Sequence, residues 1–134
     1  MRIVVDTNVL VSGIFWKSSP ARVLDLWRLG KYQLALSKPI FDEYSRILRK
    51  LDLRYQSPAT EHFLTLLGKN SLFFIPPTLH TPKCDDPKDQ MFLELAVCAK
   101  ASYIVSGDDD LLRLREYPGG KIIGPGPFCR LFQL

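Results

Sequence analysis

The chain has 134 residues and a formal net charge of +4, from 18 lysines and arginines against 14 aspartates and glutamates. This length fits one compact domain, and no apolar run approaches the roughly 20 residues of a membrane-spanning helix. The first residues, MRIVVDTN, turn acidic too early for a secretory signal peptide. The three cysteines, Cys84, Cys98 and Cys129, are an odd number at scattered positions, which indicates reduced thiols in a cytoplasmic protein rather than a disulfide or zinc framework.

The charges are unevenly distributed along the chain. Basic residues dominate from Lys17 to Arg54, whereas acids concentrate at 83–90, KCDDPKDQ, and at 106–112, SGDDDLL. A basic region beside a compact acidic cluster is what metal-dependent handling of a phosphate backbone needs. A randomly charged surface remains the alternative at this point.

Short β-branched runs alternate with segments of helical periodicity. In chain order, the patterns predict a strand at 2–5, a helix at 18–30, a strand at 32–37, helices at 38–51 and 57–70, and a strand at 72–75. They then predict a helix at 86–101, a strand at 103–106, a helix at 109–117, a strand at 121–124 and a helical turn within 127–134. This alternation favours an α/β fold with a mostly parallel sheet.

Two aspartates directly follow predicted strands. Asp6 comes after the strand at 2–5, and Asp108 comes just after the strand at 103–106. Open parallel sheets form their sites outside the carboxyl ends of the strands, so both carboxylates are expected at one edge. A helix cap or a turn residue is the alternative for each of them.

Two further acids lie on predicted helices. At about 100° per residue, Glu43 falls at the margin of an apolar stripe, where it either points into a cleft or pairs with Arg46. Asp89 lies in the first turn of its helix, where the helix dipole favours negative charge, but it shares a face with Phe92. We therefore expect Asp89 at the rim of the core.

Four acids packed together would raise one another's pKa and destabilise the fold unless a cation compensated them. Oxygen ligands without histidine or cysteine suit Mg²⁺ or Mn²⁺. His62 and His80 fall in a surface helix and a proline-rich loop, and we expect neither to be catalytic.

The segments VVDTNVLVSGIF, IFDEYSRIL and DPKDQMFLELAVCAKASYIVSGDDDLL, in this order, resemble the PIN domain family. The likeness extends to the small bacterial and archaeal PIN proteins regarded as toxins of toxin–antitoxin pairs, the VapC-type ribonucleases. It covers nearly the whole chain. It implies a single three-layer α/β/α domain over residues 1–134, with a mostly parallel sheet of four to five strands.

In that family, clustered acids bind Mg²⁺ or Mn²⁺ and hydrolyse RNA phosphodiester bonds. Matched by position, the catalytic metal ligands would be Asp6, Glu43, Asp89 and Asp108, and Asp110 would be a further, less certain ligand. The residues that orient these ligands or water would be Thr7, Asn8 and Ser106. Asp109 departs from the pattern, because the family commonly has a lysine or a variable residue there.

The resemblance implies metal-assisted hydrolysis, with Asp89 or Asp108 positioning or deprotonating the attacking water. Basic residues that could hold single-stranded RNA are Lys17, Arg22, Arg46 and Arg49. A homodimer and a cognate antitoxin protein are the expected partners. Phe15 and Trp16, expected in a loop, could be core residues, stack on bases or contact such a partner.

Other classes of protein fit less well. A haloacid-dehalogenase-type phosphatase needs a second aspartate where this chain has Asn8, and a receiver domain needs paired acids before Asp6. A catalytically weak PIN-like module that binds RNA or a protein is the remaining alternative, and loss of some of the four acids would be expected in it.

Overall fold

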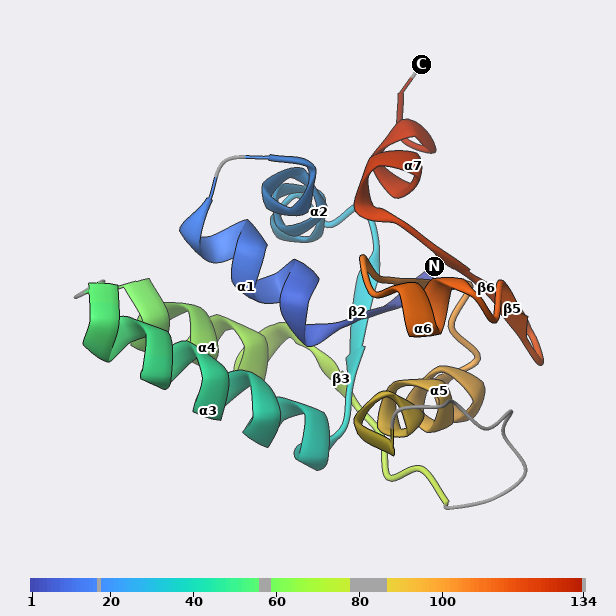
Figure 1. Cartoon of the computed structure of the whole chain (residues 1–134), viewed down its shortest axis with the longest axis horizontal. Coiled ribbons are helices and arrows are strands. Elements are labelled where there is room, and N and C mark those ends of the chain that lie inside the picture. The colour runs from blue at the N-terminus through green and yellow to red at the C-terminus, as the bar shows by residue number, and fades with distance from the viewer. Residues whose placement is uncertain (17, 56–58, 78–86, 134) are drawn as a thin grey trace.

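The computed structural model describes residues 1–16, 18–55, 59–77 and 87–133 (Figure 1). Its elements are β1 (Arg2–Val5), α1 (Thr7–Phe15), α2 (Ser19–Arg28), β2 (Gln33–Leu36), α3 (Lys38–Tyr55), α4 (Ala59–Asn70), β3 (Leu72–Phe73), α5 (Pro87–Ala99), β4 (Tyr103–Val105), α6 (Asp109–Leu112), β5 (Glu116–Tyr117), β6 (Gly120–Ile123) and α7 (Pro125–Arg130).

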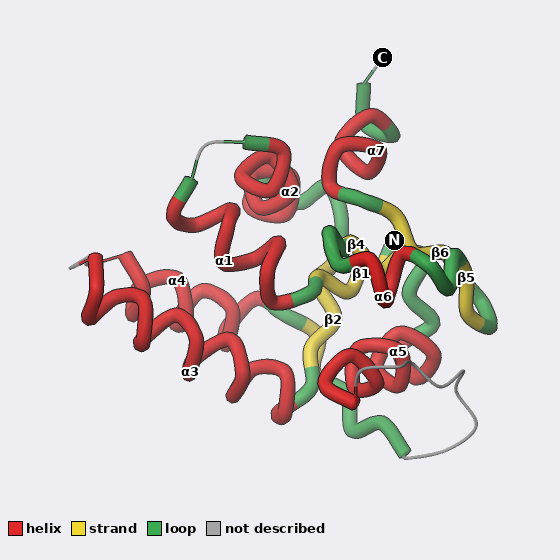
Figure 2. Tube along the Cα trace, viewed as in Figure 1, coloured by secondary structure: helices red, strands yellow, loops and turns green. Residues whose placement is uncertain are grey.

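The strands form one sheet in the order β3-β2-β1-β4-β6-β5. Every neighbouring pair is parallel except β5 and β6, which form an antiparallel hairpin. Figure 2 shows β1, β2 and β4 at the centre with helices around them, and β5 at one side. The predicted α/β class with a mostly parallel sheet is confirmed, with one strand more than the four to five expected.

The additional strand comes from the segment predicted as one helix over 109–117. The helix ends at Leu112, and Arg115 takes a positive φ of 64°, a left-handed conformation that helices do not continue through. Tyr117 then buries its ring, and its hydroxyl donates a hydrogen bond of 2.7 Å to the Ala101 carbonyl. This long-range contact has no signal in the local periodicity, which explains the error.

Helix α1 is the element that the sequence patterns missed. It begins directly after Asp6 and continues to Phe15, so Phe15 lies in a helix and not in the predicted loop. Val9, Leu10 and Val11 are three consecutive buried residues on it. A helix that is apolar on several sides shows little polar contrast, and a search for amphipathic periodicity therefore overlooks it.

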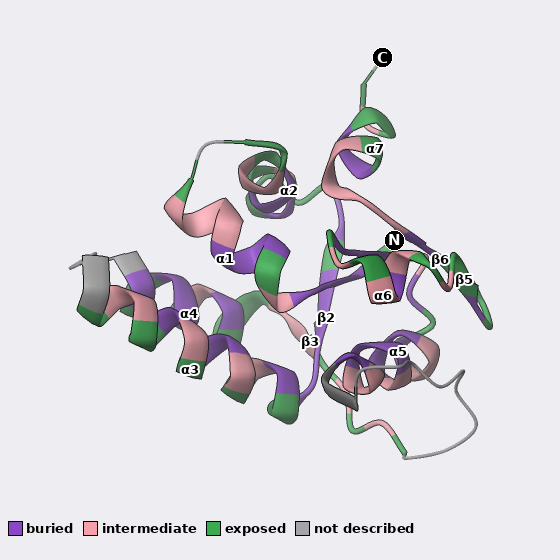
Figure 3. Ribbon diagram, in the orientation of Figure 1, coloured by how far each residue is buried: buried purple, intermediate pink, exposed green. Residues whose placement is uncertain are grey.

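Helices cover both sides of the strands. In Figure 1, α5 lies on one side of β1 and β2, and α1 and α2 lie on the other. Helix α5 buries Phe92, Leu93, Leu95, Ala96 and Ala99, as its apolar sequence predicted, and Figure 3 shows its inner surface as buried. Within the described ranges, no helix combines the length and apolar character that crossing a bilayer requires.

The register of the central strands sets up the carboxyl edge of the sheet. Val5 of β1 is paired with Val105 of β4, and β4 in turn is paired with β6. The Asp6 amide continues the ladder by donating to the Val105 carbonyl at 3.0 Å, and the Ser106 amide donates to Ile123 at 2.9 Å. Asp6 and Ser106 are therefore held side by side where the two strands end.

Candidate active site

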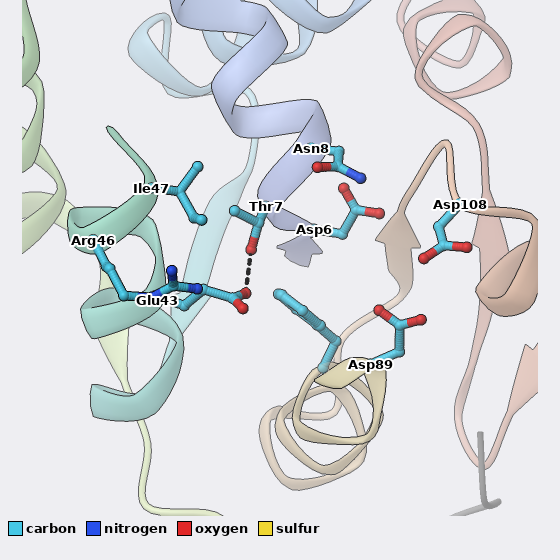
Figure 4. Close-up of a pocket in the computed structure, with 9 residues that line it drawn as sticks. Asp6, Thr7, Asn8, Glu43, Arg46, Ile47, Asp89 and Asp108 are labelled. Atoms are coloured by element: carbon cyan, nitrogen blue, oxygen red, sulfur yellow. Dashed lines mark hydrogen bonds between the residues drawn. The ribbon is translucent and has the colours of Figure 1, made fainter. Parts of the chain in front are cut away.

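A pocket of about 220 Å³ opens at this edge of the sheet (Figure 4). The four acids predicted to converge all line it, although they come from widely separated parts of the chain. The lining residues are Asp6, Thr7, Asn8, Glu43, Arg46, Ile47, Asp89, Phe92 and Asp108.

Asp6 is a buried carboxylate, only 3% exposed. One oxygen accepts a hydrogen bond of 2.9 Å from the Val9 amide and so caps α1, and the other accepts a short hydrogen bond from the Ser106 hydroxyl. Burial raises the pKa of Asp6, and the hydrogen bonds from Ser106 and Val9 oppose that rise. Asp6 is thus a helix cap, as the alternative interpretation held, and also a pocket residue.

Ser106 connects the ends of two strands. Its hydroxyl donates to Asp6 and accepts a hydrogen bond of 2.9 Å from the Asp108 amide. Asp108 in turn accepts a hydrogen bond of 2.9 Å from the Asp110 amide and caps the short helix α6. The negative charge of Asp108 adds to the rise in the pKa of Asp6. Ser106 therefore fixes the Asp6 carboxylate and the Asp108 backbone at the acidic edge.

Glu43 enters the pocket from α3. The Thr7 hydroxyl donates a hydrogen bond of 2.5 Å to its Oε2 atom, drawn as a dashed line in Figure 4. The neighbouring Tyr44 is fully buried and its hydroxyl donates a short hydrogen bond to the Val5 carbonyl, which ties α3 to the end of β1. Burial raises the pKa of Tyr44 well above its ordinary value, so the phenol remains a neutral donor.

Three carboxylates are close enough to share a cation. Asp89, Asp108 and Asp110 each offer an oxygen, and these oxygens all lie within 4.8 Å of one another. Asp89 is 8% exposed, at the rim of the core as predicted. Among the described residues that line the pocket, none is histidine or cysteine, and carboxylate oxygens are the donors that hard divalent cations prefer.

The sequence model of the PIN domain matches residues 2–110, a range that contains all of these acids. This chain belongs to the PIN domain family. PIN domains are generally nucleases, and they typically use a divalent metal. No curated protein matches the chain significantly.

The cations predicted to hold RNA are dispersed on this PIN domain. Arg46 lines the pocket, whereas Arg22 and Arg49 do not. The Arg49 guanidinium instead donates to Glu61 of α4 at 2.8 Å. Lys17 lies outside the described residues. Of the three predicted cations in the described ranges, Arg46 is therefore the one that lines the acidic pocket.

Two apolar residues of the pocket were predicted as core residues and not as site residues. Ile47 follows Glu43 by one helical turn on α3, and Phe92 follows Asp89 by one turn on α5. Spacings of three and four residues place each of them on the face of the acid that it follows. That spacing is the signal in the sequence, and core packing alone produces the same spacing.

The histidine and cysteines of the described ranges, His62, Cys98 and Cys129, do not line the pocket. His62 is exposed on α4 and does not line it, and His80 and Cys84 lie outside the described residues. Cys98 and Cys129 are free thiols. Burial raises the pKa of Cys129, which keeps that thiol protonated and unreactive.

Proposed function

We propose that this PIN protein is a Mg²⁺- or Mn²⁺-dependent endoribonuclease that hydrolyses RNA phosphodiester bonds. The observation that carries the proposal is the meeting of Asp6, Glu43, Asp89 and Asp108, from four separate segments, in one pocket. The nuclease activity general to the family supports it. Degeneration into a binding module would be expected to remove some of these acids, and all four are present.

The donor set fits a hard divalent cation. Asp89 and Asp108 would hold it, with Asp110 beside them, because the oxygens of these three lie within 4.8 Å of one another. Asp6 and Glu43 line the same pocket. When bound, such a cation polarises a phosphate oxygen and lowers the pKa of a bound water.

Residues in and beside the pocket have separate roles in the proposed reaction. Ser106 orients the Asp6 carboxylate and holds the Asp108 backbone, and Thr7 orients Glu43. Asp89 or Asp108 takes the proton of the attacking water. Arg46, exposed on the pocket wall, binds a phosphate of the RNA backbone. We propose single-stranded RNA as the substrate, because its unpaired bases can splay out beside the pocket.

We also propose that residues 1–134 form one PIN domain. Residues after 110 extend the same sheet, since β6 pairs with β4. Phe128 of α7 contacts Tyr32 and Tyr103, with ring centroids 5.3 and 6.3 Å apart, and so shares the core of the matched region.

The expected biological setting is that of a cytoplasmic toxin with a cognate antitoxin protein and a homodimeric state. Large apolar side chains exposed at Trp16, Leu53 and Ile75, by 51%, 86% and 96%, would serve as contacts for such partners. Light scattering of the purified protein over a range of concentrations tests the dimer, and a mass equal to the 15.3 kDa chain at every concentration would contradict it.

RNA cleavage with Mg²⁺ or Mn²⁺, compared with EDTA and with Asp6→Asn, tests the activity. We expect Asp6→Asn to lower the rate by at least about a hundredfold, since residues that only support metal ligands already contribute about 10- to 100-fold. Glu116→Gln, an exposed acid on β5 outside the pocket, is the matched control and should cleave normally.

Equal cleavage in all of these conditions would exclude a metal nuclease at this pocket. If a broad panel of RNAs is left intact in the presence of either metal, the alternative of a catalytically weak module that binds RNA or a protein is favoured instead.

A further inference from the structure

A second, larger pocket lies away from the acids, between the end of α2, the start of β2 and the last turns of α4. Its volume is about 500 Å³. Pockets that hold small ligands are typically about 300–1,000 Å³. Since β2 runs parallel to β1, the start of β2 belongs to the edge of the sheet opposite Asp6. The two pockets are therefore separate sites.

One part of this pocket is a rigid apolar wall. Trp27 and Tyr32 line it and are only 7% and 4% exposed. Trp27 packs edge-on against Phe63 at 5.9 Å, and the Tyr32 hydroxyl donates to the Val23 carbonyl at 2.8 Å. With Leu66 they give the pocket a fixed apolar lining, which a flat ring could contact without reordering these side chains.

The pocket is electrostatically the reverse of the acidic pocket. None of the described residues that line it is acidic, and it contains the Arg28 guanidinium. Lys31 and Lys69 are exposed lysines next in sequence to lining residues. Arg28 approaches Asp25 at 3.5 Å, but the two side chains are 47% and 62% exposed, and such a surface pair is weak enough for an anion to displace.

Polar amides complete the lining. Gln33, at the start of β2, and Asn70, at the end of α4, both offer hydrogen-bond donors and acceptors. An apolar wall, a cation and two amides together match a ligand with a flat ring, polar ring edges and a negative group. That combination is the chemistry of a nucleotide.

We propose that this pocket binds a nucleotide, with its base against Trp27, Tyr32 and Leu66 and its phosphate at Arg28. A free mononucleotide and the terminal nucleotide of an RNA chain have this same chemistry. None of the acids of the first pocket takes part, so the proposal stands or falls separately from nuclease activity.

Fluorescence of Trp27 tests the proposal. The chain has two tryptophans, and Trp16→Phe leaves Trp27 as the single reporter. Titration with AMP, GMP, CMP and UMP in EDTA should give saturable quenching below about 1 mM for at least one of them. Adenosine should bind about tenfold more weakly than AMP, because it lacks the charge that Arg28 would contact.

Two variants locate the bound nucleotide. Arg28→Glu should weaken binding by about tenfold or more, whereas Lys50→Glu, the same charge change on the exposed face of α3, should not alter it. Asn70→Phe narrows the pocket at the exposed end of α4 without disturbing the core, and should also weaken binding. This second variant keeps the test decisive if Arg28→Glu does not fold.

Three results would overturn the proposal: no saturable quenching with any nucleotide, equal binding of adenosine and AMP, or unchanged binding in both Arg28→Glu and Asn70→Phe. The source of the nucleotide is decided by a 5′-phosphorylated hexaribonucleotide. Tighter binding than the mononucleotide identifies an RNA end, and equal or weaker binding identifies a free nucleotide.

Discussion

The Asp6 carboxylate caps α1 through the Val9 amide and at the same time lines the acidic pocket. The end of β1 fixes the position of Asp6. One side chain therefore serves both the cap of α1 and the acidic pocket. Because the carboxylate is buried beside Asp108, its negative form is disfavoured when no cation is present. Burial of this charge therefore lowers the free energy of unfolding, and a bound cation would offset that loss.

Asp6→Asn should stabilise the metal-free protein at neutral pH. A carboxyl whose native pKa is raised above its ordinary value of 3.8 makes the free energy of unfolding fall as pH rises through the interval between the two values. Asparagine has no charge to bury and is an equally good helix cap. The gain should be full at pH 7 and shrink as pH falls through that interval.

Urea unfolding in EDTA, at steps from pH 7 to about pH 4, measures this difference. Glu116→Gln, an exposed carboxyl, should show no comparable gain. A lower stability of Asp6→Asn than of the unmodified chain at pH 7 would mean that burial of the charge is not the dominant effect.

The neighbouring carboxylates Asp108 and Asp110 should contribute unequally to cleavage. Asp108 lines the pocket and is fixed by Ser106, whereas Asp110 does not line it and lies 3.6 Å from Arg113. We expect Asp108→Asn to lower the rate by about a hundredfold or more and Asp110→Asn by about tenfold.

Single-turnover cleavage in saturating Mn²⁺ compares the two variants, and asparagine retains the cap of α6 in Asp108→Asn, so that a loss reports on chemistry. An equal or larger loss in Asp110→Asn would move the centre of the site toward α6.

At the scale of elements, α1 is held against α2 by a close approach at Gly13. A Cβ atom there would lie 2.7 Å from both the Leu24 side chain and the Pro20 carbonyl. The residue therefore allows the two helices to pack, and α1 in turn presents Thr7 to Glu43. The glycine, which weakens α1 intrinsically, is needed for packing.

Gly13→Ala should destabilise the protein by about 1–3 kcal/mol through overpacking, despite the higher helix propensity of alanine. Gly68→Ala in α4 is the matched control, because no atom lies within 4 Å of its Cβ position. That variant should instead gain up to about 1 kcal/mol. Chemical denaturation of both distinguishes the effects, and two changes of the same sign would refute the packing argument.

At the scale of the whole molecule, a basic chain of net charge +4 concentrates acids at one edge of its sheet. A cation bound at Asp89 and Asp108 would stabilise the native state, since the unfolded chain does not hold these acids together. Folding and metal affinity should therefore be linked.

Mn²⁺ at a hundred times its dissociation constant should raise the free energy of unfolding by about 2.7 kcal/mol. Thermal unfolding with and without Mn²⁺ measures the shift, and Asp89→Asn should remove most of it. Glu116→Gln should retain the shift. An identical response of Asp89→Asn and the unmodified chain would place the cation elsewhere.

The sequence by itself determined the α/β class, most of the strands and which four acids line the pocket. Strand ends and helix faces are local properties of the chain, and they can be predicted without tertiary contacts. Asp6 and Asp108 follow apolar runs, and Glu43 and Asp89 lie at the margins of apolar helix faces. Those patterns can be recognised from residues that are neighbours in the sequence.

The tertiary structure alone decided which residues meet. The hydrogen bonds from Thr7 to Glu43 and from Ser106 to Asp6 join positions 36 and 100 residues apart. It also brought Arg46, but not Arg22 or Arg49, to the lining of the pocket, and it formed α1 and β5 against local signals. Such contacts depend on strand register and on burial, and both are set by packing across the whole chain.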